Sequence, residues 1–173
     1  MRTITILASV AAALGAGAVV SNAQDRAPAA LDAALAAECA RELPAPAAGA
    51  PATFVKLDGI AGESAVDTFR IGFAAPGGAR PLVLGKPYDK ATQPVLQRLL
   101  SGTPIAKVVL TQQKAAGVFL KYTLTGVTAI DVEHTGRVAA NSDRICLAFT
   151  QGEVEYRPTN PDGTLGAPVK TQF

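Results

Sequence analysis

The pattern of apolar residues beyond Thr53 is the feature that most limits how this chain can fold. Apolar and polar residues alternate there in short runs, such as Phe69–Phe73 and Ile145–Phe149. An alternation of period two places every second side chain on the same face of a β-strand. Turn sequences, among them Asp58–Gly59 and Asn160–Gly163, separate the runs. Many short strands joined by such turns predict a mainly β domain, either a barrel or a sandwich.

Three segments of this domain do not show simple alternation. Gly126 stands where the apolar residues change phase, which predicts a β-bulge. Asp131–Arg144 is polar and irregular, and we expect a loop there. The tail Thr164–Phe173 follows a strong turn, and we expect it to return as an edge strand.

One helix is predicted between the strands. Thr92 is the expected N-cap, Pro94 lies in the first turn, and Gly102 suits the left-handed C-cap position. The residues expected to form its apolar face are Val95, Leu96, Leu99 and Leu100. A helix of two to three turns needs tertiary packing, so we expect this face to cover one side or end of the sheet.

The N-terminus has the pattern of a secretory signal peptide. A single early charge at Arg2 precedes the uncharged run Ile4–Val20, and small residues in Ser21–Ala23 follow. We expect residues 1–23 to be removed between Ala23 and Gln24, which would leave an exported, periplasmic or secreted protein. The alternative is a transmembrane anchor, but this run is short for a membrane span and rich in Ala and Gly.

Residues 24–52 form an alanine- and proline-rich segment before the β domain, which we place at residues 53–173. Ala27–Ala37 favours a short helix, and the prolines of Pro44–Pro51 predict a semi-rigid linker. Both cysteines, Cys39 and Cys146, remain after the expected cleavage. Because export places them in an oxidising compartment, we predict a disulfide between them, with two buried thiols as the alternative.

The charge balance excludes several classes of partner. Sixteen Lys and Arg residues face fourteen Asp and Glu residues, a net charge of +2, and only 17% of the chain is charged. Such a chain has no strong field to attract nucleic acid or acidic membranes. We therefore expect no nucleic-acid partner, and no membrane contact once the signal is removed.

Two residues that could be reactive are better explained by structural roles. His134 could join Asp131 and Glu133 in a metal site, but no second cluster completes the coordination, and a solvated loop is favoured. Ser64 lacks the flanking residues of a nucleophile elbow, and a turn serine is favoured.

Other charged candidates are also assigned to the surface. Glu63 and Asp67 are expected at a surface turn rather than as paired catalytic carboxylates. Four basic residues form a local excess that could recognise a partner, although a solvated face is favoured for Lys86 and Lys90: Arg80, Lys86, Lys90 and Arg98. The sequence has no phosphate-loop, dinucleotide or zinc motif, and we predict no catalytic residue, cofactor or metal.

Three motifs occur in an order that resembles a known family. Phe54–Ser64 opens the domain, Lys86–Leu96 leads into the helix that Ser101–Gly102 closes, and Val154–Lys170 ends the chain. The motif residues are Lys56, Asp58, Gly59, Gly62, Glu63, Ser64, Asp89, Lys90, Thr92, Leu96, Gly102, Tyr156, Pro158, Asp162 and Gly163. Together they resemble the haemolysin-coregulated protein (Hcp) family, the tube subunit of bacterial type VI secretion systems.

This resemblance carries expectations for fold and function. It implies a small antiparallel β-barrel with one covering α-helix, here preceded by a short N-terminal helix. It implies a structural protein rather than an enzyme, which forms homo-hexameric rings, builds a tube and carries effectors, without cofactors. A ring that closes head to tail needs two different complementary surfaces on each subunit, and exposed sheet edges are suited to such contacts.

Two features favour an alternative function. The expected signal peptide would send the chain through general export, and the connection Ala74–Gly85 looks shorter than the long loop of the family. The alternative is an exported monomeric binding or interaction module that keeps the barrel without assembling a tube.

Overall fold

The computed structural model describes residues 28–46, 48–73, 80–136 and 141–173. The predicted signal peptide and its cleavage site lie outside these residues.

The described strands are β1 (Ala52–Leu57), β2 (Ser64–Val66), β3 (Thr68–Ile71), β4 (Arg80–Pro87), β5 (Ile105–Lys114), β6 (Gly117–Gly136), β7 (Asn141–Phe149), β8 (Gln151–Tyr156) and β9 (Val169–Gln172). The described helices are α1 (Pro28–Ala40) and α2 (Thr92–Ser101). Neither described helix is long and apolar enough to cross a membrane. The prediction of a mainly β fold is confirmed.

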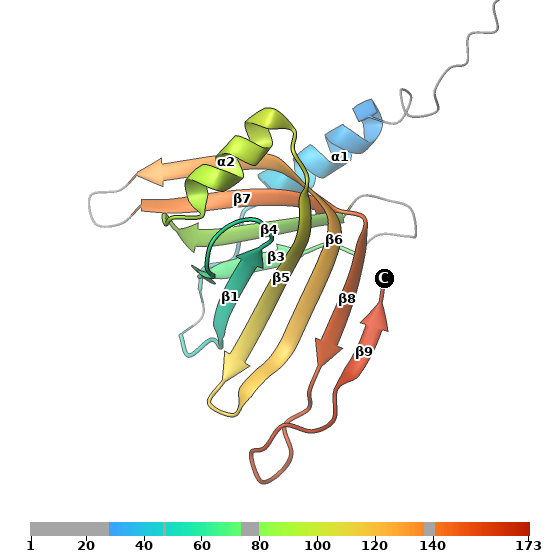
Figure 1. The fold of residues 1–173 in the computed structure, drawn as a ribbon. Helices are drawn as coiled ribbons and strands as arrows, with labels where there is room; N and C mark the ends of the chain where they lie inside the picture. Colours follow the sequence, from blue (N-terminus) through green and yellow to red (C-terminus); the bar gives the residue numbers. More distant parts are fainter. Residues whose placement is uncertain (1–27, 47, 74–79, 137–140) are drawn as a thin grey trace, which may run out of the picture.

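All strand pairs are antiparallel, and the long strand β6 connects two groups of strands (Figure 1). The first part of β6 pairs with β5 on one side and β8 on the other, and the ladder continues to β1, β2 and β9. The second part of β6 pairs with β7, and the ladder continues to β4 and β3. The predicted edge strand near the C-terminus is confirmed as β9.

The hydrogen-bonded ladder is open between β2 and β3. These strands follow each other directly in the chain, but β2 pairs with β1 whereas β3 pairs with β4. The change of partner occurs at Asp67, whose N–H donates to the carbonyl of Gly85 at 2.9 Å. A continuous stretch of backbone, rather than a row of paired residues, therefore connects the two ends of the ladder.

The main core lies between the two groups of strands. The inner row of β7 comprises Ile145, Leu147 and Phe149, all with 0% exposure, which confirms the predicted alternation. On the paired strand β4, Leu82 and Leu84 form the matching inner row. Val95 of α2 joins this core, and Figure 1 shows α2 lying across one end of the strands.

The structure corrects two details of α2. The N-cap is Ala91, not Thr92, because the Thr92 side chain is buried and bonds to Asp143. Leu100, which we expected on the apolar face, is 78% exposed. The predicted C-cap is confirmed: Gly102 has φ +63°, and its N–H meets the carbonyls of Arg98 and Leu99.

The predicted loop at Asp131–Arg144 is wrong, because most of this segment is a hairpin. Residues 128–136 of β6 pair with β7, and its polar side chains pair across the two strands: Glu133 faces Arg144 and His134 faces Asp143. Because these polar side chains pair with one another across the two strands, the sequence of neither strand shows a clear alternation of apolar and polar residues there. The register of β6 shifts in two places, against β5 between Val118 and Leu120 and against β7 between Ala129 and Asp131, and neither shift is at the predicted Gly126.

Helix α1 is attached to the outer face of β4 and β7. Cys39 and Cys146 form the predicted disulfide, with Cα atoms 5.6 Å apart. The bond joins residues separated by 107 positions and so links α1 to a strand that is distant in the sequence. Leu35, Val83 and Ala148 pack around it in a second, smaller apolar cluster.

Candidate functional site

The free edge of β9 is the most accessible part of the sheet for pairing with another chain. Among the described strands, β9 pairs only with β8. Gly152 and Phe173 exchange both backbone hydrogen bonds, each 2.9 Å long. Because such pairs alternate along an antiparallel ladder, the N–H and C=O groups of Lys170 and Gln172 point away from β8. An extended segment of another chain can pair with these groups.

The inner side of this edge is apolar and only partly covered. Tyr156 of β8 and Val169 of β9 are register partners, 47% and 61% exposed respectively. Farther along the same face, Phe173 contacts the rings of Phe73 and Phe149, with centroids 4.9 and 6.0 Å away. The β8–β9 pair is therefore anchored at the Phe173 end and leaves apolar side chains exposed at the Val169 end.

Gly152 is required where Phe173 packs on β8. A Cβ atom at Gly152 would lie 2.6 Å from the ring of Phe173, closer than side chains tolerate. Arg80 covers the same ring, with its guanidinium carbon 5.7 Å from the centroid. Glycine on β8 thus allows Phe173 to pack closely and anchor β9.

The outer side of the edge carries a row of opposite charges. Lys170 of β9 lies 3.1 Å from Glu153 and 3.4 Å from Glu155, both on β8. The hydrogen bond from Arg157 and those from Lys170 hold the pKa of Glu155 below its usual range, and the hydrogen bonds to Glu153 and Glu155 raise the pKa of Lys170. This face stays charged at neutral pH, and its ion pairs link β9 to β8.

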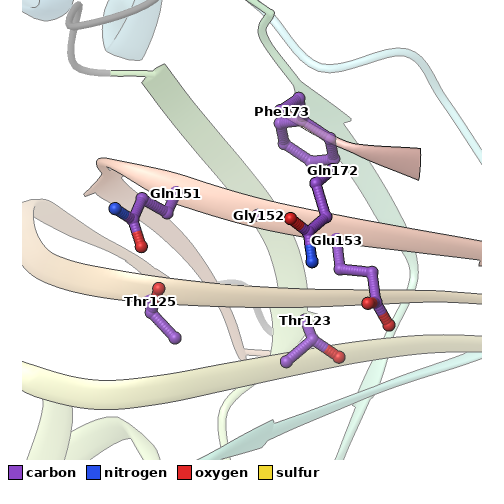
Figure 2. Close-up of a pocket in the computed structure, with 7 residues that line it drawn as sticks. All are labelled: Thr123, Thr125, Gln151, Gly152, Glu153, Gln172 and Phe173. Carbon is purple, nitrogen blue, oxygen red and sulfur yellow. The ribbon is translucent and has the colours of Figure 1, made fainter. Parts of the chain in front are cut away.

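A shallow hollow lies on the outer face of β6, β8 and β9. Figure 2 shows Thr123 beside Glu153 and Thr125 beside Gln151, as their register requires. The lining residues are Thr123, Thr125, Gln151, Gly152, Glu153, Gln172 and Phe173. The lining lacks histidine, cysteine and lysine, and its single carboxylate, Glu153, is already paired with Lys170. The hydroxyl, amide and aromatic side chains of this lining can form hydrogen-bonded and apolar surface contacts.

A polar cluster is buried where β4, β7 and α2 meet. The inner rows of the two strands end in Lys86 and Asp143, which are register partners with fully buried side chains 3.3 Å apart. Lys86 Nζ also donates to Asp89 at 2.8 Å and to Thr92 at 3.3 Å. The prediction that Lys86 lies on a solvated face is therefore wrong.

Asp89 connects this cluster to the beginning of α2. Burial raises its pKa, but hydrogen bonds from Lys86, Ser64 and the backbone N–H of Ala91 outweigh burial, and the pKa lies below its usual range. The carboxylate oxygen accepts the Ala91 N–H at 2.8 Å. The helix entry is thus held by a charge that itself depends on the buried lysine.

His134 belongs to a strand and borders the same cluster. Its Nδ1 atom lies 3.0 Å from Asp143 Oδ1, and its ring meets that of Tyr88 edge-on, with centroids 4.9 Å apart. Asp131 and Glu133 lie on the same strand, yet the described residues contain no group of three or more His, Cys, Asp or Glu arranged to hold a metal. Asp143, which organises the cluster, was not singled out from the sequence. The alternation Leu82–Leu84–Lys86 was the signal that could have indicated a buried charge.

Two other predicted sites have different surroundings from those expected. Ser64 is buried at the start of β2 rather than in a turn, while Glu63 and Asp67 are exposed, as expected. The predicted basic group is not one surface, because Arg80 and Lys86 are buried. Arg80 donates to the carbonyl of Thr150 at 3.0 Å.

The motif residues are spread over several parts of the fold. Asp89 and Thr92 take part in the buried cluster, and Tyr156 lies beside the free edge. The turn before β9 contains Asp162, whose pKa is lowered by hydrogen bonds from the Thr164 hydroxyl and N–H. The motif residues on the surface are Lys56, Asp58, Gly59, Gly62, Glu63, Lys90, Gly102, Pro158, Asp162 and Gly163, and Leu96 is half-buried.

Comparison with known proteins finds one family match over part of the chain and several structures of similar fold. The family model described as "Type VI secretion system effector, Hcp" matches residues 74–156. The crystal structure of Hcp1 from Salmonella typhimurium is similar with a TM-score of 0.63 and 22% identity, over 72% of this chain and 94% of that one. The crystal structure of Hcp2 from the same organism is similar with a TM-score of 0.61 and 25% identity, over 70% of this chain and 94% of that one.

A third similar structure comes from another organism. A type VI secretion system effector from Yersinia pestis gives a TM-score of 0.61 and 21% identity, over 70% of this chain and 98% of that one. A search of curated proteins found no match. The matched segment runs from the β3–β4 connection to the end of β8 and so includes the helix entry, the buried cluster and the strand that supports the free edge. The chain is therefore similar to the Hcp family of type VI secretion proteins, in sequence over residues 74–156 and in fold over most of its length.

Proposed function

We propose that this chain is a structural subunit that assembles into hexameric rings and tubes of a type VI secretion system, or a relative derived from one. The observation that supports this most strongly is the family match over residues 74–156 together with the likeness to solved Hcp structures. In this proposal the two groups of strands act as one barrel wall, α2 covers one end, and the subunit has no catalytic role.

The edge of β9 is the surface that we assign to one side of the ring contact. It offers outward backbone groups at Lys170 and Gln172, and exposed apolar side chains at Tyr156 and Val169. A closed ring is heterologous, so this edge meets a different surface on the neighbouring subunit. Effectors carried in a tube would be further partners.

Light scattering after size-exclusion chromatography of residues 24–173 tests the assembly, and negative-stain images test its shape. We expect a hexamer with a central hole. A protein that stays monomeric at high concentration would contradict the ring.

A matched pair of variants tests the assigned surface. Val169→Lys places a charge on the exposed end of β9 and should convert the hexamer to monomers without lowering the unfolding temperature. Leu100→Lys changes an exposed leucine on α2 and should leave the hexamer intact. Equal behaviour of the two variants would show that the ring contact lies elsewhere.

The disulfide supports a second candidate function. A bond between Cys39 and Cys146 is maintained in an oxidising compartment, which agrees with a signal peptide cleaved after Ala23 and with an exported, monomeric binding module. N-terminal sequencing of protein recovered from the periplasm tests the cleavage. A monomer whose two cysteines resist alkylation would favour this candidate over the ring.

A further inference from the structure

Helix α1 covers a surface that is separate from the main core. Cys146 and Ala148 point away from the inner row of β7, and Val83 points away from the inner row of β4. These three residues pack with Leu35 and Cys39 of α1 in the second apolar cluster, which shares no buried residue with the first. The helix can therefore leave this face without opening the main core.

Two arginines attach the end of α1 to the strands. Arg70 of β3 donates to the backbone carbonyls of Glu38, Arg41 and Glu42, and Arg144 of β7 donates to that of Cys39. They satisfy carbonyl groups that are left without partners at the end of a helix. The contacts are polar and converge on the same few residues as the disulfide.

This attachment leaves two polar groups poorly satisfied. In the part of the chain that the structure describes, the buried Nε atoms of Arg70 and Arg144 have no hydrogen-bond partner. A buried donor without a partner is destabilising, whereas a donor exposed to water is satisfied. Arg70 Nε lies 3.8 Å from the Glu38 carboxylate, beyond hydrogen-bond distance, so the polar attachment at this end is incomplete.

From these observations we infer that α1 is a redox-controlled cover over the outer face of β4 and β7. The Cys39–Cys146 bond keeps the helix in place, and its reduction releases the helix. A dithiol performs the step: one of its thiolates attacks a sulfur atom, its second thiol resolves the mixed disulfide, and two protons yield the thiols of Cys39 and Cys146 while the reagent becomes a cyclic disulfide. The released state exposes Val83, Cys146 and Ala148. This inference does not depend on whether rings form.

The burial of the bond adds a kinetic expectation. Cys39 and Cys146 are 3% and 1% exposed, so a dithiol reaches the sulfur atoms only when the helix lifts. Reduction in the folded protein should therefore be slow, and its rate should rise when a contact of α1 is removed. Leu35→Ala should speed it, whereas Leu100→Ala, which changes an exposed leucine on the other helix, should not.

Hydrogen exchange measured by mass spectrometry tests the cover in the full chain. After reduction with dithiothreitol, amides of residues 35–43 should exchange about tenfold faster or more, while those of Ile145–Phe149 keep their protection. Binding of an apolar fluorescent dye should increase in parallel. The variant with both Cys39→Ser and Cys146→Ser should match the reduced protein and should not respond to the dithiol.

Each remaining outcome overturns the inference. Unchanged protection of residues 35–43 after reduction would mean that the non-covalent contacts alone hold the helix. Loss of protection across both β7 and β5, or a double variant that does not fold, would mean that the disulfide supports the whole domain rather than a cover.

Discussion

The β4–β7 pair and the β8–β9 pair are both antiparallel, but their surroundings are opposite. β4 and β7 are covered on one face by the main core and on the other by α1, so consecutive residues such as Ile145, Cys146 and Leu147 are all buried. β8 and β9 have a solvated outer face, a partly covered inner face and a free edge. A strand pair buried on both faces determines stability, whereas a pair with a free edge is available to another molecule.

The two strand pairs should differ most in the free energy of unfolding that is lost when a charged side chain is removed. Asp143→Ala leaves Lys86 buried without its main partner and should lower the free energy of unfolding by about 3–5 kcal/mol. Glu153→Ala removes an exposed partner of Lys170 and should cost about 1 kcal/mol or less. Urea denaturation of both variants measures the contrast, and equal losses would show that the buried cluster is not the stronger element.

A second contrast concerns apolar contacts. Leu147→Ala deletes a fully buried side chain on β7 and should cost about 2–5 kcal/mol. Val169→Ala, on the exposed end of β9, should change stability by about 0.5 kcal/mol or less. The same denaturation curves give both values. A loss at Val169 as large as that at Leu147 would show that the exposed end of β9 is buried in solution by another molecule.

The smallest expected difference lies in how Asp89 and Asp162 change the stability of the protein in acid. The folded pKa values of Asp89 and Asp162 both lie below the usual range, so each carboxylate contributes stability that is present above about pH 4 and is lost as the pH falls through its folded pKa. Asp89→Asn should flatten the decline in stability between about pH 5 and pH 2. Asp162→Asn, in an exposed turn, should flatten it less. The reverse order in thermal melts across that range would show that the turn before β9 is the more acid-sensitive element.

Local patterns were enough to predict much of the fold. Alternation identified β1 and β7, the turn at Asn160–Gly163 identified the return of β9, and Gly102 identified the end of α2. Each of these features depends on residues that are close in sequence. Two cysteines behind a segment with the pattern of a secretory signal were enough to predict the disulfide.

The failures share a different cause. Lys86 and Asp143 are 57 positions apart, and nothing near either residue shows that the other neutralises it. His134 and Glu133 looked like loop residues because their partners lie on the next strand. Thr92 has the side chain of an N-cap, yet it faces a buried carboxylate instead of the helix end. Long-range polar pairing decided all three cases, and a single sequence does not display it.

The shared strand β6 has a mechanical consequence. Its 20 residues are bonded to β5 and β8 along one half and to β7 along the other. A pull applied at β9 passes through rows of main-chain hydrogen bonds into β8, then β6, then β7. A load applied at the free edge would therefore be shared by both groups of strands rather than carried by β8 and β9 alone.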